Sequence, residues 1–232
     1  MKTVLVTGGV RGIGKAIALA FLKKGYRVCV SYSSDEESAS AARADGLEVY
    51  RADVRKEDEV HALFATVGGV DILVNNAGVS LWELFQDTTA EQFDNLFDVN
   101  VRGVFFCARE AVKGMLQKKS GLIVNIASVW GEVGGSCESV YSASKGAVLA
   151  LTKALAKELG YSGIRVNAVS PGMIDTRMNA RFTAEDLQSI REEIPAGRFG
   201  DVDEVAKAVL FLEENEYVTG IDLPVNGGFS VV

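Results

Sequence analysis

The sequence predicts an α/β protein with a single doubly wound parallel sheet and helices on both faces. Two observations carry this prediction. Short runs of β-branched and apolar residues alternate with longer segments of helical periodicity along the 232 residues. Each short run is apolar throughout, which is typical of strands buried on both faces of a parallel sheet. Because crossover connections are almost always right-handed, few topologies remain, and the doubly wound arrangement fits best.

The first strand is expected at Thr3–Thr7 and the first helix at Gly12–Lys24, where Ile13, Ile17 and Phe21 recur at helical spacing. The same alternation then continues to the end of the chain, which predicts a Rossmann-like fold. The further strands and helices, alternating and beginning with a strand, are expected at Arg27–Ser31, Asp35–Ala44, Leu47–Arg51, Glu57–Thr66, Asp71–Val74, Ala90–Gln117, Leu122–Ile126, Val140–Leu159, Arg165–Val169, Val202–Leu212 and Ile221–Val225.

The longest irregular stretch runs from Pro171 to Gly200, after the sixth strand, and has helical character at Ala184–Glu193. Ligands in such sheets bind beyond the carboxyl ends of the strands, so residues 171–200 are a candidate substrate lid. Neither a repeat nor a low-complexity linker marks a second domain. Residues 1–232 are therefore expected to form one domain.

Composition narrows the function classes. The net charge of −7 argues against a nucleic-acid partner, and no apolar stretch is long enough to suggest a membrane span. Three separated cysteines, Cys29, Cys107 and Cys137, fit a reduced, cytoplasmic setting. His61 is the single histidine of the sequence, which argues against a serine–histidine–aspartate triad and against a metal site built from several histidines. No metal is therefore expected.

A glycine-rich turn follows the first strand. Residues 7–14 read TGGVRGIG, with glycines at Gly8, Gly12 and Gly14, and a helix is expected to open there. Free N–H groups at a helix start favour a pyrophosphate, and glycines let the phosphates approach the backbone. The turn therefore indicates a dinucleotide site.

The spacing T-G-x-x-x-G-x-G resembles the short-chain dehydrogenase/reductase family, and the resemblance covers nearly the whole chain. Residues 75–78 resemble its N-N-A-G element, residues 141–145 its Y-x-x-x-K element, and Pro171-Gly172 and residues 197–200 further family elements. The 3-oxoacyl-acyl-carrier-protein reductase branch is the most similar. The resemblance implies reduction of a ketone on a small molecule or a carrier, and assembly as a homodimer or homotetramer.

Tyr141 and Lys145 are four residues apart on an expected helix and so share a face. A neighbouring ammonium favours a phenolate, which suits a tyrosine for proton exchange. The resemblance assigns Tyr141 as general acid, Lys145 as its tuning group and ribose ligand, and Ser128 as the group that orients the carbonyl. The resemblance also implies that Asn100 binds a water molecule that links Lys145 to solvent. Ser128 could instead cap a turn, and Asn100 could also satisfy backbone groups.

The end of the second strand lacks an acid: Tyr32 stands eighteen residues after Gly14, and Ser33 follows. Arg11 could pair with a 2′-phosphate, so NADP(H) is preferred over NAD(H). The residues expected to contact the cofactor, most of them from the resemblance, are Gly8, Arg11, Gly12, Ile13, Gly14, Ser33, Asp53, Val54, Asn76, Ala77, Gly78, Tyr141, Lys145, Pro171, Gly172, Ile174 and Thr176.

The substrate is less closely constrained. The residues GGSCE at 134–138 replace the N-x-G-Q of related acyl-carrier reductases and bring Glu138 near the pocket, where Trp82, Trp130 and Met173 could also lie. The first expectation is a 3-oxoacyl-carrier-like ketone. An acidic pocket would also suit a ketone on a protein side chain, such as 5-aminopentanone on elongation factor P. A third alternative is a dinucleotide-sensing regulator without turnover, although such proteins typically lose the tyrosine or the lysine.

Overall fold

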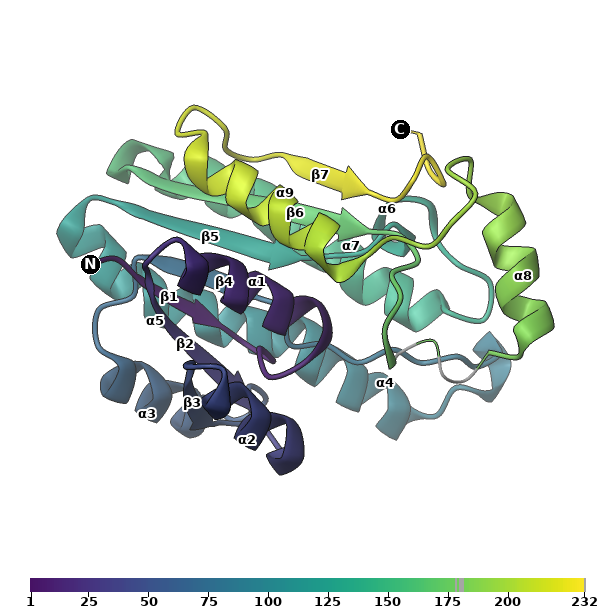
Figure 1. Cartoon of the computed structure of the whole chain (residues 1–232), viewed down its shortest axis with the longest axis horizontal. Helices are drawn as coiled ribbons and strands as arrows, with labels where there is room; N and C mark the ends of the chain where they lie inside the picture. The colour runs from purple at the N-terminus through teal and green to yellow at the C-terminus, as the bar shows by residue number, and fades with distance from the viewer. Residues whose placement is uncertain (178, 180–181, 232) are drawn as a thin grey trace.

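The structure is a computed structural model that describes residues 1–177, 179 and 182–231. Within these residues the chain forms a seven-stranded sheet in the order β3-β2-β1-β4-β5-β6-β7, in which every neighbouring pair is parallel (Figure 1). This confirms the predicted fold class. The strands are β1 Thr3–Val6, β2 Arg27–Tyr32, β3 Glu48–Arg51, β4 Ile72–Asn75, β5 Gly121–Ile126, β6 Ile164–Pro171 and β7 Asp222–Val225.

Helices cover both faces of the sheet. One core contains α1 (Gly12–Lys23), α2 (Glu36–Ala44) and α9 (Val202–Glu214), and α1 and α9 lie in front of the strands in Figure 1. The opposite core contains α3 (Glu57–Val67), α5 (Gly103–Lys118) and α7 (Ser139–Leu159). The helix α4 (Ala90–Phe97) precedes α5 along the chain and contacts α7. The remaining helical segments are α6 Trp130–Val133, α8 Ala184–Glu193, and the short turns η1 Phe85–Asp87, η2 Asp98–Arg102 and η3 Gly160–Ser162.

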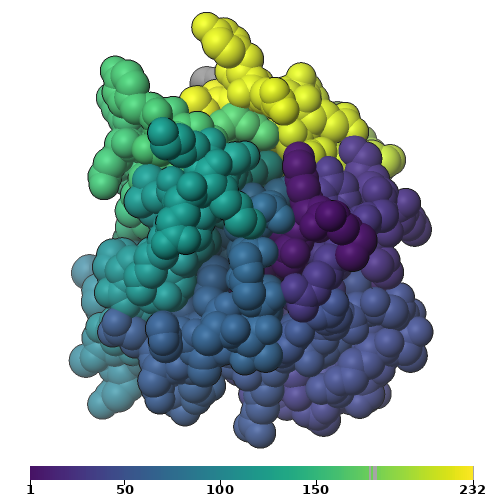
Figure 2. Space-filling view, turned by 90° about the vertical axis from the view of Figure 1, so that its left-hand side faces the viewer, coloured from purple at the N-terminus to yellow at the C-terminus, as the bar shows by residue number. Residues whose placement is uncertain are grey.

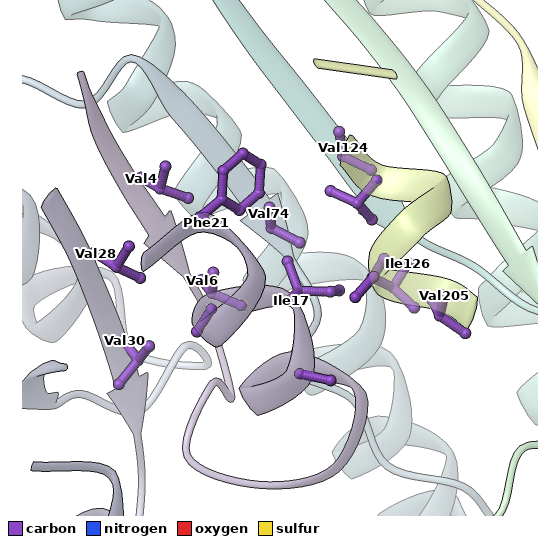
Figure 3. Close-up of a cluster of buried hydrophobic side chains, with 14 of the residues drawn as sticks. Val4, Val6, Ile17, Phe21, Val28, Val30, Val74, Val124, Ile126 and Val205 are labelled. Atoms are coloured by element: carbon purple, nitrogen blue, oxygen red, sulfur yellow. The ribbon is translucent and has the colours of Figure 1, made fainter. Parts of the chain in front are cut away.

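The two cores explain why the strands are apolar throughout. Side chains alternate across a strand, so Val4 and Val6 of β1 enter the core beneath α1, where Ile17 and Phe21 meet them (Figure 3). Leu5, between them, enters the opposite core. A polar residue at any of these positions would be buried, which accounts for the continuous apolar runs.

The segment expected as one helix at Ala90–Gln117 is interrupted. The five-residue π-helical turn η2, Asp98–Arg102, joins α4 to α5, and its central residue Asn100 is fully buried. A π-turn adds a residue to the helical path and often lies at a functional site. The apolar periodicity of the flanking segments runs through it, so the pattern alone does not reveal the turn.

The carboxyl ends of all strands lie at one edge of the sheet, on the right in Figure 1. The strand order reverses between β1 and β4, which is where ligands bind in such sheets. The amino ends lie at the left, the end that faces the viewer in Figure 2. None of the helices in the described part of the chain combines the length and hydropathy that crossing a bilayer requires.

Candidate active site

The turn between β1 and α1 is shaped by its glycines. Gly8 and Gly12 have φ of +61° and +52°, the left-handed region that favours glycine. A Cβ on Gly14 would lie 2.4 Å from Asn76 Nδ2 and 2.6 Å from the carbonyl oxygen of Gly8. No side chain caps the start of α1, and its first turn carries no acid. Its N–H groups are therefore suited to an anion.

The segment after β4 holds this turn in place. Asn76 Nδ2 donates to the carbonyl oxygens of Thr7 and Gly8, both at 3.0 Å. Thr7 Oγ1 accepts from the main-chain nitrogens of Asn76 and Ala77, also at 3.0 Å. The N-N-A-G element thus fixes the glycine turn from the neighbouring strand, at the point where the strand order reverses.

Gly14→Ala is expected to weaken dinucleotide binding severely, because the added methyl would displace Asn76 and the glycine turn together. Cofactor titration followed by nicotinamide fluorescence measures the effect. Gly114→Ala is the matched control, since no heavy atom lies within 4 Å of its Cβ position. That helix substitution should preserve binding. Equal binding by both variants would contradict the close packing described here.

Two adjoining cavities open at the carboxyl edge. The larger, about 910 Å³, is lined by the glycine turn, and the smaller is about 400 Å³. Ile13, Asn76, Ser80 and Thr176 line both, so the two form one crevice. Its size and its uncapped helix start fit a dinucleotide.

Most of the predicted residues line this crevice, in two groups. Gly8, Arg11, Gly12, Ile13, Gly14, Asn76 and Thr176 line the larger cavity. Gly78, Ser128, Tyr141, Lys145, Pro171, Gly172 and Ile174 line the smaller. Ser33, Asp53, Val54, Ala77 and Asn100 are described residues that line neither.

Lys145 is buried beside Tyr141. Lys145 lies one helical turn after Tyr141 in α7 and is 5% exposed. Its Nζ lies 5.8 Å from the centroid of the Tyr141 ring. Nζ donates to the carbonyl oxygen of Ile126 at 2.8 Å, and burial lowers the pKa of Lys145 to about 8. Gly78 lies beside this ammonium: a Cβ there would be in ordinary van der Waals contact with Nζ, at 3.6 Å.

Asn100 joins three segments around the reacting groups. Its Oδ1 accepts from the main-chain nitrogen of Val79 at 2.9 Å, and its Nδ2 donates to the Val79 carbonyl oxygen at 2.9 Å and to Ser144 Oγ at 3.1 Å. Ser144 Oγ in turn donates to the carbonyl oxygen of Tyr141 at 2.7 Å. These bonds support the backbone-satisfying role for Asn100, while the water expected there stays a prediction.

Ser128 lies just beyond the end of β5. Its Oγ accepts from the main-chain nitrogen of Trp130 at 3.2 Å, which is the turn role that the sequence left open. The same hydroxyl belongs to the smaller cavity that Tyr141 and Lys145 line. Its one O–H can still donate to a ligand, so both roles are compatible.

A comparison with known families decides the assignment. The family model described as enoyl-(acyl carrier protein) reductase matches residues 8–230, which include the glycine turn, Ser128, Tyr141 and Lys145. The chain belongs to the short-chain dehydrogenase/reductase family. It is therefore a nicotinamide-dependent oxidoreductase that acts on carbonyl or hydroxyl groups.

Relatives of this short-chain dehydrogenase/reductase match it over almost its whole length. A 3-oxoacyl-[acyl-carrier-protein] reductase of Staphylococcus aureus is 39% identical over 98% of this chain and 97% of its own. An uncharacterized oxidoreductase of Bacillus subtilis is 39% identical over 98% of each chain. Carbonyl reductase family member 4 of Xenopus laevis is 40% identical over 99% of this chain and 98% of its own.

Arg11 of this oxidoreductase has a partner that the sequence did not reveal. Its Nη1 lies 3.0 Å from Asp35 Oδ2, although the two residues are 24 positions apart. Asp35 caps α2 by accepting from the main-chain nitrogen of Ser38. Hydrogen bonds from Ser38, and then the charges of Arg11 and Arg177, lower the pKa of Asp35. A cofactor phosphate at Arg11 would compete with this carboxylate.

The predicted adenine contacts make protein contacts of their own. The Asp53 carboxylate accepts from Arg55 Nε at 3.0 Å and from its Nη2 at 2.6 Å, and these hydrogen bonds lower the pKa of Asp53. Val54 is buried against Gly103, whose Cβ position lies 2.7 Å from Val54 Cγ2. The Ser33 carbonyl oxygen accepts from Arg51 Nε at 3.0 Å. Their contacts to a cofactor stay predictions.

The smaller cavity also contains residues that the sequence did not single out. Phe182, Ile190 and Glu193 come from the expected lid, and Phe229 comes from the last residues of the described chain. Trp82, Trp130, Met173 and Glu138 line it as expected. Residues 178, 180 and 181 of the expected lid lie outside the described residues. An aromatic residue near a chain end gives no sequence signal that it reaches a cavity.

Proposed function

We propose that this protein is an NADPH-dependent reductase of a 3-oxoacyl-(acyl-carrier-protein)-like ketone, which it converts to the 3-hydroxy product. One observation carries the proposal: Ser128, Tyr141 and Lys145 line a single cavity that adjoins the glycine-rich crevice. The Staphylococcus relatives named as 3-oxoacyl-carrier reductases support the substrate class.

The chain's own residues supply binding, orientation and a proton. When bound, the nicotinamide supplies the hydride for the carbonyl carbon. Ser128 would donate a hydrogen bond to the ketone oxygen, and Tyr141 would donate its phenolic proton to the same oxygen as the bond order falls. The charged Lys145 beside Tyr141 would favour the phenolate that remains.

The direct test is NADPH oxidation by a 3-oxoacyl thioester, with NADH assayed side by side. The proposal predicts turnover of the thioester with a preference for NADPH. Binding of NADPH without oxidation across a broad ketone panel would contradict it and would favour the sensing regulator.

Arg11→Ala is expected to raise the KM for NADPH by about tenfold or more, because a charge-assisted bond to the 2′-phosphate is lost. The KM for NADH should change little. Arg43→Ala is the matched control, since it removes another exposed arginine that pairs with an acid, Glu36, outside the crevice. An equal rise in KM for NADPH and for NADH would show that Arg11 does not bind the 2′-phosphate.

A second candidate is reduction of a ketone on a protein side chain that also carries an amine, such as 5-aminopentanone on elongation factor P. The carboxyl groups of Glu138 and Glu193 line the cavity and would attract such a cation. A model peptide with this group and a 3-oxoacyl thioester, assayed with wild type and Glu193→Gln, separate the candidates. Loss of activity on the amine substrate alone would favour the second.

We further propose a homodimer or homotetramer in the cytoplasm. Phe93 of α4 and Phe105 of α5 are more than 40% exposed, which supports an interface on these helices. The free cysteines support a reduced compartment. Light scattering coupled to gel filtration tests the assembly, and a monomer would contradict it.

A further inference from the structure

Two aromatic pairs build much of the wall of the smaller cavity. Trp130 and Phe229 meet edge to face, with ring centroids 5.2 Å apart and planes at 88°. Trp82 and Phe182 meet in the same way, at 5.4 Å and 86°. All four rings line the cavity. Aromatic pairs at this geometry are attractive beyond their burial, so each pair forms a firm wall.

The segment that carries Phe229, residues 226–231, is fixed at several points. The Gly227 carbonyl oxygen accepts from the main-chain nitrogen of Ala196 at 3.0 Å, which attaches the segment to the stretch after α8. Ser230 Oγ donates to Glu132 Oε2 of α6 at 3.0 Å. Within the segment, Asn226 Nδ2 donates to the Ser230 carbonyl oxygen at 3.0 Å. Figure 1 shows this end of the chain beside α6.

Two glycines give the segment its shape. Gly227 and Gly228 have φ of +65° and +88°. The Cβ position of Gly227 lies 2.9 Å from Ile194 Cγ2, and that of Gly228 lies 3.2 Å from Pro195. The chain therefore turns tightly against the stretch after α8, and Phe229 follows directly from this turn toward Trp130.

Phe229 is also close in the structure to the reacting groups. Its ring partner Trp130 donates its main-chain N–H to Ser128 Oγ, the hydroxyl proposed to hold the ketone oxygen. A substituent on that ketone must occupy the remaining space of the same cavity. Because Phe229 and Ser128 line the same cavity, a long substituent on that ketone would compete with the Phe229 ring for space.

We propose that Phe229 is a specificity-determining residue that limits the length of the ketone's apolar substituent. The inference rests on the proposed ketone reductase function. Glu132 acts as a positioning residue, because it holds Ser230 next to Phe229. Shortening Phe229 should lengthen the substituent that the cavity accepts, and removing the Glu132 contact should loosen the same wall.

The experiment compares wild type, Phe229→Ala and Phe229→Leu on N-acetylcysteamine thioesters of 3-oxo acids with four, eight and twelve carbons. Phe229→Ala should raise kcat/KM for the longest substrate relative to the shortest by about tenfold, mostly through KM, which matches the usual discrimination by a few methylenes. Phe229→Leu should fall between. Tyr161→Ala removes a fully exposed aromatic ring elsewhere and should leave the length profile unchanged.

If Phe229→Ala changed kcat/KM by the same factor for all three chain lengths, the inference would be overturned, because Phe229 would then affect only stability or turnover. If wild type reduces none of the thioesters, the proposed function fails separately. Calorimetric binding of the same series to the NADPH complex then supplies the test, where an unchanged length preference in Phe229→Ala would again overturn it. Glu132→Ala should lower KM for the longest substrate and leave kcat for the shortest one in place, whereas Glu132→Gln, whose side-chain oxygen can still accept from Ser230, should keep the wild-type length profile.

Discussion

Replacing Tyr141 with phenylalanine is expected to lower kcat/KM for ketone reduction by about a hundredfold or more, which is the contribution of a positioned general acid. Phenylalanine keeps the ring that lies 5.8 Å from Lys145 Nζ and removes only the hydroxyl. Steady-state NADPH oxidation measures the loss. Cofactor affinity, followed by nicotinamide fluorescence, should stay within a few fold of wild type.

Tyr161→Phe is the matched control, because that hydroxyl sits on a fully exposed side chain in η3. It should retain wild-type activity. Retained activity in Tyr141→Phe would contradict the role assigned to Tyr141 and move the proton donor to another residue of the cavity.

Lys145→Met is expected to abolish most activity and to stabilise the protein. Activity should fall on the order of a hundredfold, since the ammonium that favours the phenolate is lost. The free energy of unfolding without cofactor should rise by about 1 kcal/mol, because relief of the desolvation that lowers the pKa of Lys145 outweighs the lost bond to Ile126. Denaturant unfolding and kinetics on the same sample measure both.

The same burial predicts a pH dependence of stability. The pKa of Lys145 falls from 10.5 to about 8 in the folded protein, so between these values the unfolded chain binds more protons. The free energy of unfolding contributed by this group therefore rises as pH increases from about 8 toward 10.5. Wild type should show this rise relative to Lys145→Met. A constant difference between the two across that range would contradict the lowered pKa of Lys145.

Much of the fold can be predicted from local sequence patterns, without knowledge of which distant residues come into contact. Val4, Leu5 and Val6 are buried on both faces of the sheet, so the apolar run of β1 is itself the signal. Tyr141 and Lys145 line one cavity because four residues make about one helical turn. The glycine turn can be predicted from the sequence because Gly8 and Gly12 take backbone conformations that few other residues adopt.

The rest depends on contacts between distant segments. Asn100, at the centre of the π-turn, forms hydrogen bonds to Val79 and Ser144, and helical periodicity does not report such contacts. The pairing of Arg11 with Asp35 and the arrival of Phe229 beside Trp130 likewise depend on how separate elements pack. A sequence pattern records the residue types in such contacts and leaves their partners open.

The central claim is that Tyr141 protonates the ketone oxygen in the cavity next to the glycine-rich crevice. Its most direct measurement is a single turnover, in which excess enzyme with bound NADPH meets a 3-oxoacyl thioester and nicotinamide absorbance is followed in time. Tyr141→Phe should hold NADPH fully bound and oxidise it about a hundredfold or more slowly than wild type. Equal rates in this single turnover would contradict the claim.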